Sequence, residues 1–139
     1  MSFNYFERTI EYFKDKFSFL KAYQNYHVFT ILCIRYYFFS ANSVTFDPEI
    51  AVEYLTDGTR DGGIDAIFND PNSEGNDVII VQSKYYNKSK VDAEKIAGEL
   101  CKINNTLNNL KNNRVAEYNE KLVTAYQNAV SQMEDCGQY

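Results

Sequence analysis

Cysteine is scarce in this sequence of 139 residues, and no secretory signal opens it. The three cysteines, Cys33, Cys101 and Cys136, are odd in number and lack the spacing of a metal site. We therefore expect free thiols in the reducing cytoplasm rather than a disulfide framework. The first residues are amphipathic, with acids where the basic region of a leader would stand, so the sequence predicts a cytoplasmic protein.

Long apolar runs and an excess of positive charge are also missing. Residues 28–40 are very apolar, but Arg35 interrupts them and they fall short of the ~20 residues that span a bilayer. The net charge of −5 argues against a domain that binds nucleic acid through an overall basic surface. It does not argue against an enzyme that acts on nucleic acid, because catalytic carboxylates recruit divalent cations. We expect no membrane contact, and homo-oligomerisation stays open.

Aromatic residues are abundant, with ten Phe and twelve Tyr, and a hydrophobic fraction of 45% argues against disorder. The length fits one domain with a real core. Apolar periodicity, capping residues and turn formers predict an α+β (or α/β) domain with a central β-hairpin between helices. The expected helices cover residues 3–20, 24–39, 48–55, about 93–110 and 115–134, and the expected strands are "IDAIF" and "VIIVQSKYY". Asp47 is placed to cap the third helix and Pro48 to open it.

The stretch "DGTRDGGIDAIF", residues 57–68, holds three aspartates and three glycines and allows three interpretations. The first is a calcium loop of the EF-hand type, whose early positions Asp57, Asp61 and Asp65 fit. It fails at the last position, where Phe68 replaces the glutamate, and no helix is expected to follow. The second interpretation is a plain glycine turn that leads into a strand and leaves the aspartates exposed.

The third interpretation uses both strands of the hairpin. Asp65 opens one strand, while Gln82 and Lys84 lie near the end of the next and, being two apart, share a face. If the hairpin closes, a carboxylate, an amide oxygen and an ammonium group converge, a grouping that suits metal-dependent phosphodiester hydrolysis. Gly62 and Gly63 would leave room for a phosphate backbone to approach.

The segment "DGTRDGGIDAIFND…DVIIVQSKYY" resembles the core of the PD-(D/E)xK nuclease superfamily, in its variant with glutamine for the second acid. Within it, the sequence is most similar to Mrr-like restriction endonucleases and to the N-terminal domain of AIPR (abortive phage infection) proteins, over about residues 25–110. The resemblance implies a restriction-endonuclease-like αβββαβ fold and DNA cleavage with Mg²⁺ (or Mn²⁺) in restriction or phage defence. It also implies Asp65 as a metal ligand, Gln82 at the second acidic position, the Ser83 backbone carbonyl in the metal shell, and Lys84 at the attacking water.

Two features depart from that family. Relatives carry a glutamate on the helix before the core, and the best placement here puts "YHVF", with His27, at that position. His27 is either a buried structural residue or a metal ligand, and Glu53 and Glu7 are rival candidates for the missing acid. The second departure is that residues 111–139 show no final strand. We expect a single nuclease-like domain with its core at 25–110, forming the N-terminal part of a longer protein or completed by another subunit.

The sequence also leaves the function open in part. "KYYNKSK", residues 84–90, is a local basic cluster in which Lys88 and Lys90 would contact a DNA backbone or simply begin a helix. The leading hypothesis is a metal-dependent DNA endonuclease. The alternatives are a nuclease-like domain that has lost catalysis and binds DNA or assists assembly, and a purely helical interaction domain.

Overall fold

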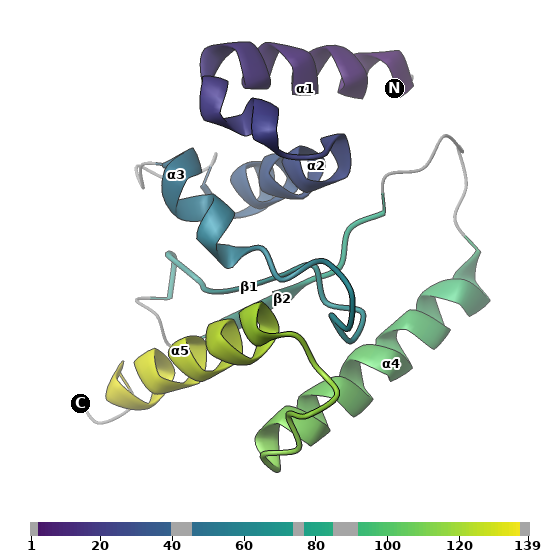
Figure 1. Cartoon of the computed structure of the whole chain (residues 1–139), viewed down its shortest axis with the longest axis vertical. Coiled ribbons are helices and arrows are strands. Elements are labelled where there is room, and N and C mark those ends of the chain that lie inside the picture. The colour runs from purple at the N-terminus through teal and green to yellow at the C-terminus, as the bar shows by residue number, and fades with distance from the viewer. Residues whose placement is uncertain (1–2, 40–45, 74–76, 85–91, 137–139) are drawn as a thin grey trace.

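The structure is a computed structural model that describes residues 3–39, 46–73, 77–84 and 92–136. Its α+β class confirms the expectation from the sequence, with helices on either side of a two-stranded antiparallel sheet (Figure 1). The elements in chain order are α1 (Phe3–Lys16), η1 (Ser18–Ala22), α2 (Asn25–Ile34), η2 (Arg35–Phe39), α3 (Pro48–Ala51), η3 (Val52–Tyr54), β1 (Ala66–Asn69), β2 (Val78–Val81), α4 (Ala93–Lys111) and α5 (Glu120–Cys136).

The hairpin forms the middle of three layers. β1 and β2 pair with Ala66 opposite Val81 and Asn69 opposite Val78. α1, α2 and α3 lie on one side of the hairpin, and α4 and α5 lie on the other (Figure 1). Each side has its own buried cluster: Phe68 belongs to the one with the N-terminal helices, and its neighbour Ile67 to the one with α4 and α5. Because successive side chains of a strand point to opposite faces, β1 contributes side chains to both buried clusters.

The N-terminal helices lie where the sequence predicts them, but each changes type before its end: α2 continues as the π-helical η2, and α3 as the 3₁₀ turn η3. The expected helix over 3–20 ends as α-helix at Lys16 and continues as the 3₁₀ turn η1. Its predicted apolar face is buried, with Ile10 and Leu20 fully inaccessible to solvent. Asp47 caps α3 as expected, since its side chain accepts a hydrogen bond from the Glu49 N–H at 2.9 Å. These helices thereby carry the chain into the loop before β1.

The C-terminal helices agree less closely with the expectation. Of the apolar stripe predicted on α4, Ile103 and Leu110 are buried, whereas Ile96 and Leu100 are largely exposed. The last helix begins at Glu120 rather than at 115 because the Asn119 side chain caps it, accepting from the Leu122 N–H at 2.8 Å. In the part of the chain that the structure describes, no strand follows β2. None of the described helices is both long and apolar enough to cross a membrane.

Candidate active site

The loop between η3 and β1, residues 56–65, is closed at its base and is called the acidic loop below. The Thr56 N–H donates to the Asp65 carbonyl at 2.9 Å, and the Thr56 hydroxyl donates to the Ile64 carbonyl at 2.9 Å. Inside the loop, the Asp61 carboxylate accepts from the N–H groups of Gly58, at 3.1 Å, and Gly63, at 2.9 Å. These local bonds hold the turn in one conformation.

Two residues far along the chain brace the acidic loop from outside. The Thr106 hydroxyl on α4 donates to the Gly62 carbonyl at 2.7 Å. The Asn119 amide donates to the carbonyls of Thr56, at 3.2 Å, and Thr59, at 3.1 Å. The sequence analysis missed both braces. Asn119 carried only the weak signal of a residue that can cap a helix, and nothing local linked Thr106 to the loop.

The glycines of the loop allow close packing of α4. Gly62 and Gly63 have φ of 63° and 84°, in the left-handed region that glycine favours. A Cβ at Gly62 would lie 2.5 Å from Thr106 Cγ2, and one at Gly63 would lie 3.2 Å from Lys102 Cδ. Side chains at these two positions would therefore meet side chains of α4. The approach of a phosphate backbone to Gly62 and Gly63 stays a prediction.

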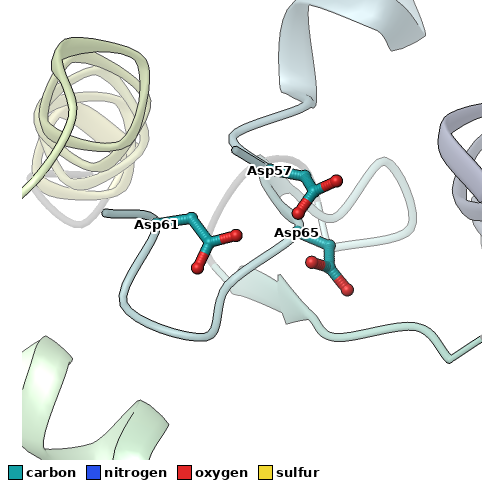
Figure 2. A group of neighbouring side chains, drawn as sticks. All are labelled: Asp57, Asp61 and Asp65. Carbon is teal, nitrogen blue, oxygen red and sulfur yellow. The ribbon is translucent and has the colours of Figure 1, made fainter. Parts of the chain in front are cut away.

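The acidic loop gathers its three aspartates. One carboxylate oxygen from each of Asp57, Asp61 and Asp65 lies within 4.8 Å of the other two. Figure 2 shows the three side chains projecting from one turn of the chain, so we call them the aspartate cluster. They are the aspartates that the calcium interpretation selected, although the EF-hand itself is absent: Phe68 is 2% exposed and lies in β1, not at the start of an exiting helix.

Burial and mutual repulsion make Asp57 and Asp65 hold protons more tightly than free carboxylates do. The pKa of Asp65 rises from 3.8 to about 6, first because of burial and then because of the charge of Asp57, against a hydrogen bond from the Ser83 N–H at 2.7 Å. The pKa of Asp57 is also raised, again chiefly by burial and with Asp61 adding to it. A positive charge near the cluster would be bound favourably.

His27 lies next to the aspartate cluster, on α2. Its Nε2 is 3.1 Å from an oxygen of Asp57, and its Nδ1 is buried without a hydrogen-bond partner in the described chain. A buried Nδ1–H without an acceptor would be costly, so a proton on Nε2, which faces Asp57, fits the contacts of this ring. His27 and Glu53 line a common cavity with Asp57, whereas Glu7 is exposed on α1.

The predicted convergence of Asp65 with Gln82 does not occur, because the strand alternation breaks at Asp65. Ile64 and Ile67 both pack on the side of α4 and α5, although strict alternation would place residues three apart on opposite faces. The Asp65 N–H donates to the Val81 carbonyl at 2.8 Å, one residue away from its expected partner Gln82. This offset, of the kind that a β-bulge produces, turns the Asp65 carboxylate toward α2.

Gln82 and Lys84 instead engage a residue that the sequence analysis did not single out. The Gln82 Nε2 donates to one oxygen of Glu99 on α4 at 2.6 Å, and the Lys84 Nζ lies 3.7 Å from its other oxygen. The pKa of Glu99 is lowered, foremost by the hydrogen bond from Gln82. All three residues line one cavity of about 280 Å³. The predicted shared face of Gln82 and Lys84 is confirmed.

A third cavity, of about 590 Å³, is lined by Asp57, Asp65 and Lys84 among others and is called the aspartate cavity. The residues that line it come from α2, the acidic loop and the segment after β2: Tyr26, Thr30, Asp57, Gly58, Thr59, Asp65, Ser83 and Lys84. The hydroxyls of Thr30 and Ser83 hydrogen-bond to each other and so join α2 to the end of β2. Lys84 thus lines two of these cavities, with its ammonium next to Glu99, whereas Asp65 lines only the aspartate cavity and Gln82 only the cavity with Glu99. Lys88 and Lys90 lie outside the described residues.

A β-hairpin layered between helices is an α+β arrangement consistent with a restriction-endonuclease-like fold. Residues 37–101 match the family model described as a restriction endonuclease, of the Mrr catalytic type. The matched segment contains the acidic loop, both strands and Glu99, and it supports a restriction-type nuclease. No curated protein and no solved structure matches the chain. The resemblance to AIPR proteins stays a prediction.

Proposed function

We propose that this domain hydrolyses DNA phosphodiester bonds with a bound Mg²⁺ or Mn²⁺, as part of restriction or phage defence. The single observation that carries the proposal is the aspartate cluster, whose members Asp57 and Asp65 share a cavity with Lys84. The match of residues 37–101 to restriction endonucleases supports the same reaction class. DNA is the substrate that this class implies.

The aspartate cluster fits a small divalent cation. Carboxylate oxygens are the ligands that Mg²⁺ and Mn²⁺ prefer. Ligands on opposite sides of Mg²⁺ lie roughly 4 Å apart, because each metal–oxygen distance is about 2.0–2.1 Å. Neighbouring ligands lie about 3 Å apart, so the three carboxylate oxygens, within 4.8 Å of one another, would need to approach by up to about 2 Å. We assign Asp57, Asp61 and Asp65 to hold the ion; Ser83, through its carbonyl, stays the predicted additional ligand.

The cation, Lys84 and Asp61 would have different tasks in this reaction. When bound, the cation offsets the phosphate charge and makes a water molecule more acidic. The Lys84 ammonium, which is partly exposed, provides a second positive charge to the phosphodiester. Asp61, held by the N–H groups of Gly58 and Gly63, keeps the loop in shape while it adds negative charge.

A cleavage assay tests the proposal. The wild-type protein should cut plasmid and linear DNA with Mg²⁺ or Mn²⁺ and lose this activity in EDTA. Lys84→Ala should lower the rate by about 10²-fold, the usual effect of removing a charge that stabilises a transition state. Lys111→Ala, an exposed lysine at the end of α4, is the control and should cut at the wild-type rate. Metal-independent cleavage, or full activity of the Lys84 variant, would contradict the proposal.

A second candidate function rests on the contacts of Glu99. Because Glu99 already engages both Gln82 and Lys84, a nuclease-like domain that binds DNA or assists assembly without cutting it is the alternative. DNA retention in a gel-shift assay, unchanged by EDTA and without cleavage by any metal, would favour this alternative over the enzyme.

A further inference from the structure

We propose that Glu99 is a positioning residue of the active site, which sets the amide of Gln82 and the ammonium of Lys84 in the orientations that cleavage requires. The inference rests on the proposed nuclease function and adds a residue of α4 to its machinery. Glu99 touches no member of the aspartate cluster in any contact described above. It acts through the two side chains that follow β2.

The contacts of Glu99 divide between its two carboxylate oxygens. Oε2 accepts from the Gln82 amide at 2.6 Å, and Oε1 lies 3.7 Å from the Lys84 ammonium. One carboxylate therefore holds the two side chains that share a face at the end of β2. The side chain of Glu99 is 26% exposed and that of Lys84 37%, so the group lies at the wall of a cavity rather than in open solvent.

The bond to Gln82 fixes which end of its amide is available. An amide donates through its nitrogen and accepts through its oxygen, and the two lie on opposite sides of the same carbon. With Nε2 directed at Glu99, the Gln82 oxygen is turned away from the carboxylate. It is then free to accept a hydrogen bond or to meet a cation.

The contact with Lys84 compensates for a charge that the strand lacks. Gln82 stands where an acidic residue is expected by the family resemblance, so β2 itself places no negative charge beside Lys84. Glu99 supplies that charge from α4, the helix that also braces the acidic loop through Thr106. One helix thereby orients groups at both cavities.

If the contact between Glu99 and Lys84 were only a structural ion pair, its loss would have different effects on stability and cleavage from the loss of a positioning residue. A partly exposed lysine–glutamate pair contributes about 0–1 kcal/mol to stability, so its loss would change the thermal midpoint by only a few degrees and leave cleavage unaffected. A positioning residue changes kcat at nearly constant stability. Loss of a group that orients catalytic side chains typically costs about 10–100-fold.

The first experiment compares Glu99→Ala with wild type in steady-state DNA cleavage with Mn²⁺. We expect kcat to fall about 10–100-fold while KM stays within about threefold. Glu94→Gln is the control on the same helix, because Glu94 is exposed and its N–H, not its side chain, makes the contact with Asp92. The proposal is overturned if Glu99→Ala keeps kcat within about twofold of wild type.

The second experiment exchanges the pair. Gln82→Glu combined with Glu99→Gln reverses the hydrogen bond between the two positions and keeps one negative charge beside Lys84. Activity should return to within about fivefold of wild type, and an exchange no more active than Glu99→Ala overturns the positioning role. A wild-type protein that cuts no DNA with Mg²⁺ or Mn²⁺ refutes the proposed function as well, whereas an active wild type with an active Glu99→Ala refutes only this inference.

Discussion

At the end of the hairpin where Asp65 and Gln82 lie, the face toward α2 and the face toward α4 differ in how their charges are arranged. Toward α2, Asp57, Asp61 and Asp65 place like charges within 4.8 Å of one another. Toward α4, Gln82 and Lys84 both find their partner in Glu99. The end of the hairpin thus separates an acidic side of clustered like charges, which His27 faces, from a side where opposite side-chain charges compensate each other.

The difference indicates separate tasks for the two sides. Like charges held together raise the free energy of the folded protein, and such an arrangement persists only where the surrounding structure enforces it. Here Thr56, Thr106 and Asn119 enforce it through hydrogen bonds to the loop backbone. The acidic side therefore suits a cation, while the compensated side suits the orientation of groups around the substrate.

The largest expected effect comes from neutralising the acidic side with Asp65→Asn. Cleavage should fall about 10³-fold, because losing a metal ligand removes several kcal/mol of stabilisation and each 1.4 kcal/mol is tenfold in rate. The metal-free protein should become more stable by about 1 kcal/mol, the repulsion of two unit charges roughly 4 Å apart in water. Asparagine keeps an acceptor for the Ser83 N–H.

Single-turnover cleavage and thermal unfolding in EDTA measure these two opposite changes. Asp77→Asn, an exposed aspartate before β2, serves as the control and should change neither quantity. If Asp65→Asn instead unfolded at a lower temperature than wild type, the three charges would not be in conflict, and the contrast between the two sides would disappear.

The next expected effect is on stability. It tests the packing of α4 on the acidic loop, which holds both sides of the site in place. Gly62→Ala should destabilise the fold by about 3 kcal/mol, because the new Cβ meets Thr106 Cγ2 at 2.5 Å on a left-handed backbone. Gly98→Ala, on α4 where no atom lies within 4 Å of the new Cβ, should stabilise by up to about 1 kcal/mol. Urea unfolding measures both, and equal values for the two variants would refute the close packing.

His27 allows a finer test of the acidic side. His27→Leu removes the donor that faces Asp57 and should weaken Mn²⁺ binding about tenfold, the usual cost of losing a group that orients a metal ligand. Calorimetric titration with Mn²⁺ measures the change, and His27→Gln, which can still donate, should recover part of it. A loss far above about a hundredfold would support instead the sequence hypothesis that His27 binds the metal directly.

The last prediction concerns the pH dependence of stability in the metal-free protein. The pKa of Asp65 in the folded chain is about 6, above its ordinary value of 3.8, so the folded state binds this proton more tightly. The resulting stabilisation is fully present below about pH 4 and is lost as the pH rises through about 6. Urea unfolding between pH 4 and 7 should show this decline in wild type and a flatter profile in Asp65→Asn. Identical profiles would show that Asp65 does not titrate as its surroundings require.

Local features of the chain allowed much of the fold to be predicted. The apolar spacing that predicts the first helix buries Ile10 and Leu20, and the two β-branched runs pair as the expected hairpin. The presence of Asp65 and Lys84 in one cavity also followed from the hairpin. Asp57 and Asp61 were visible as candidates only through their calcium-like spacing, since nothing in the strand pattern linked them to Asp65.

The amino-acid sequence by itself determined where the helices and strands lie, because periodicity, caps and turn formers act over a few residues. Only the tertiary structure decided which way the site residues face. A one-residue offset in the ladder turns Asp65 away from Gln82, and α4 brings Glu99 to Gln82 from seventeen positions along the chain. Contacts of that range depend on how whole layers pack, and no local pattern of residues records them.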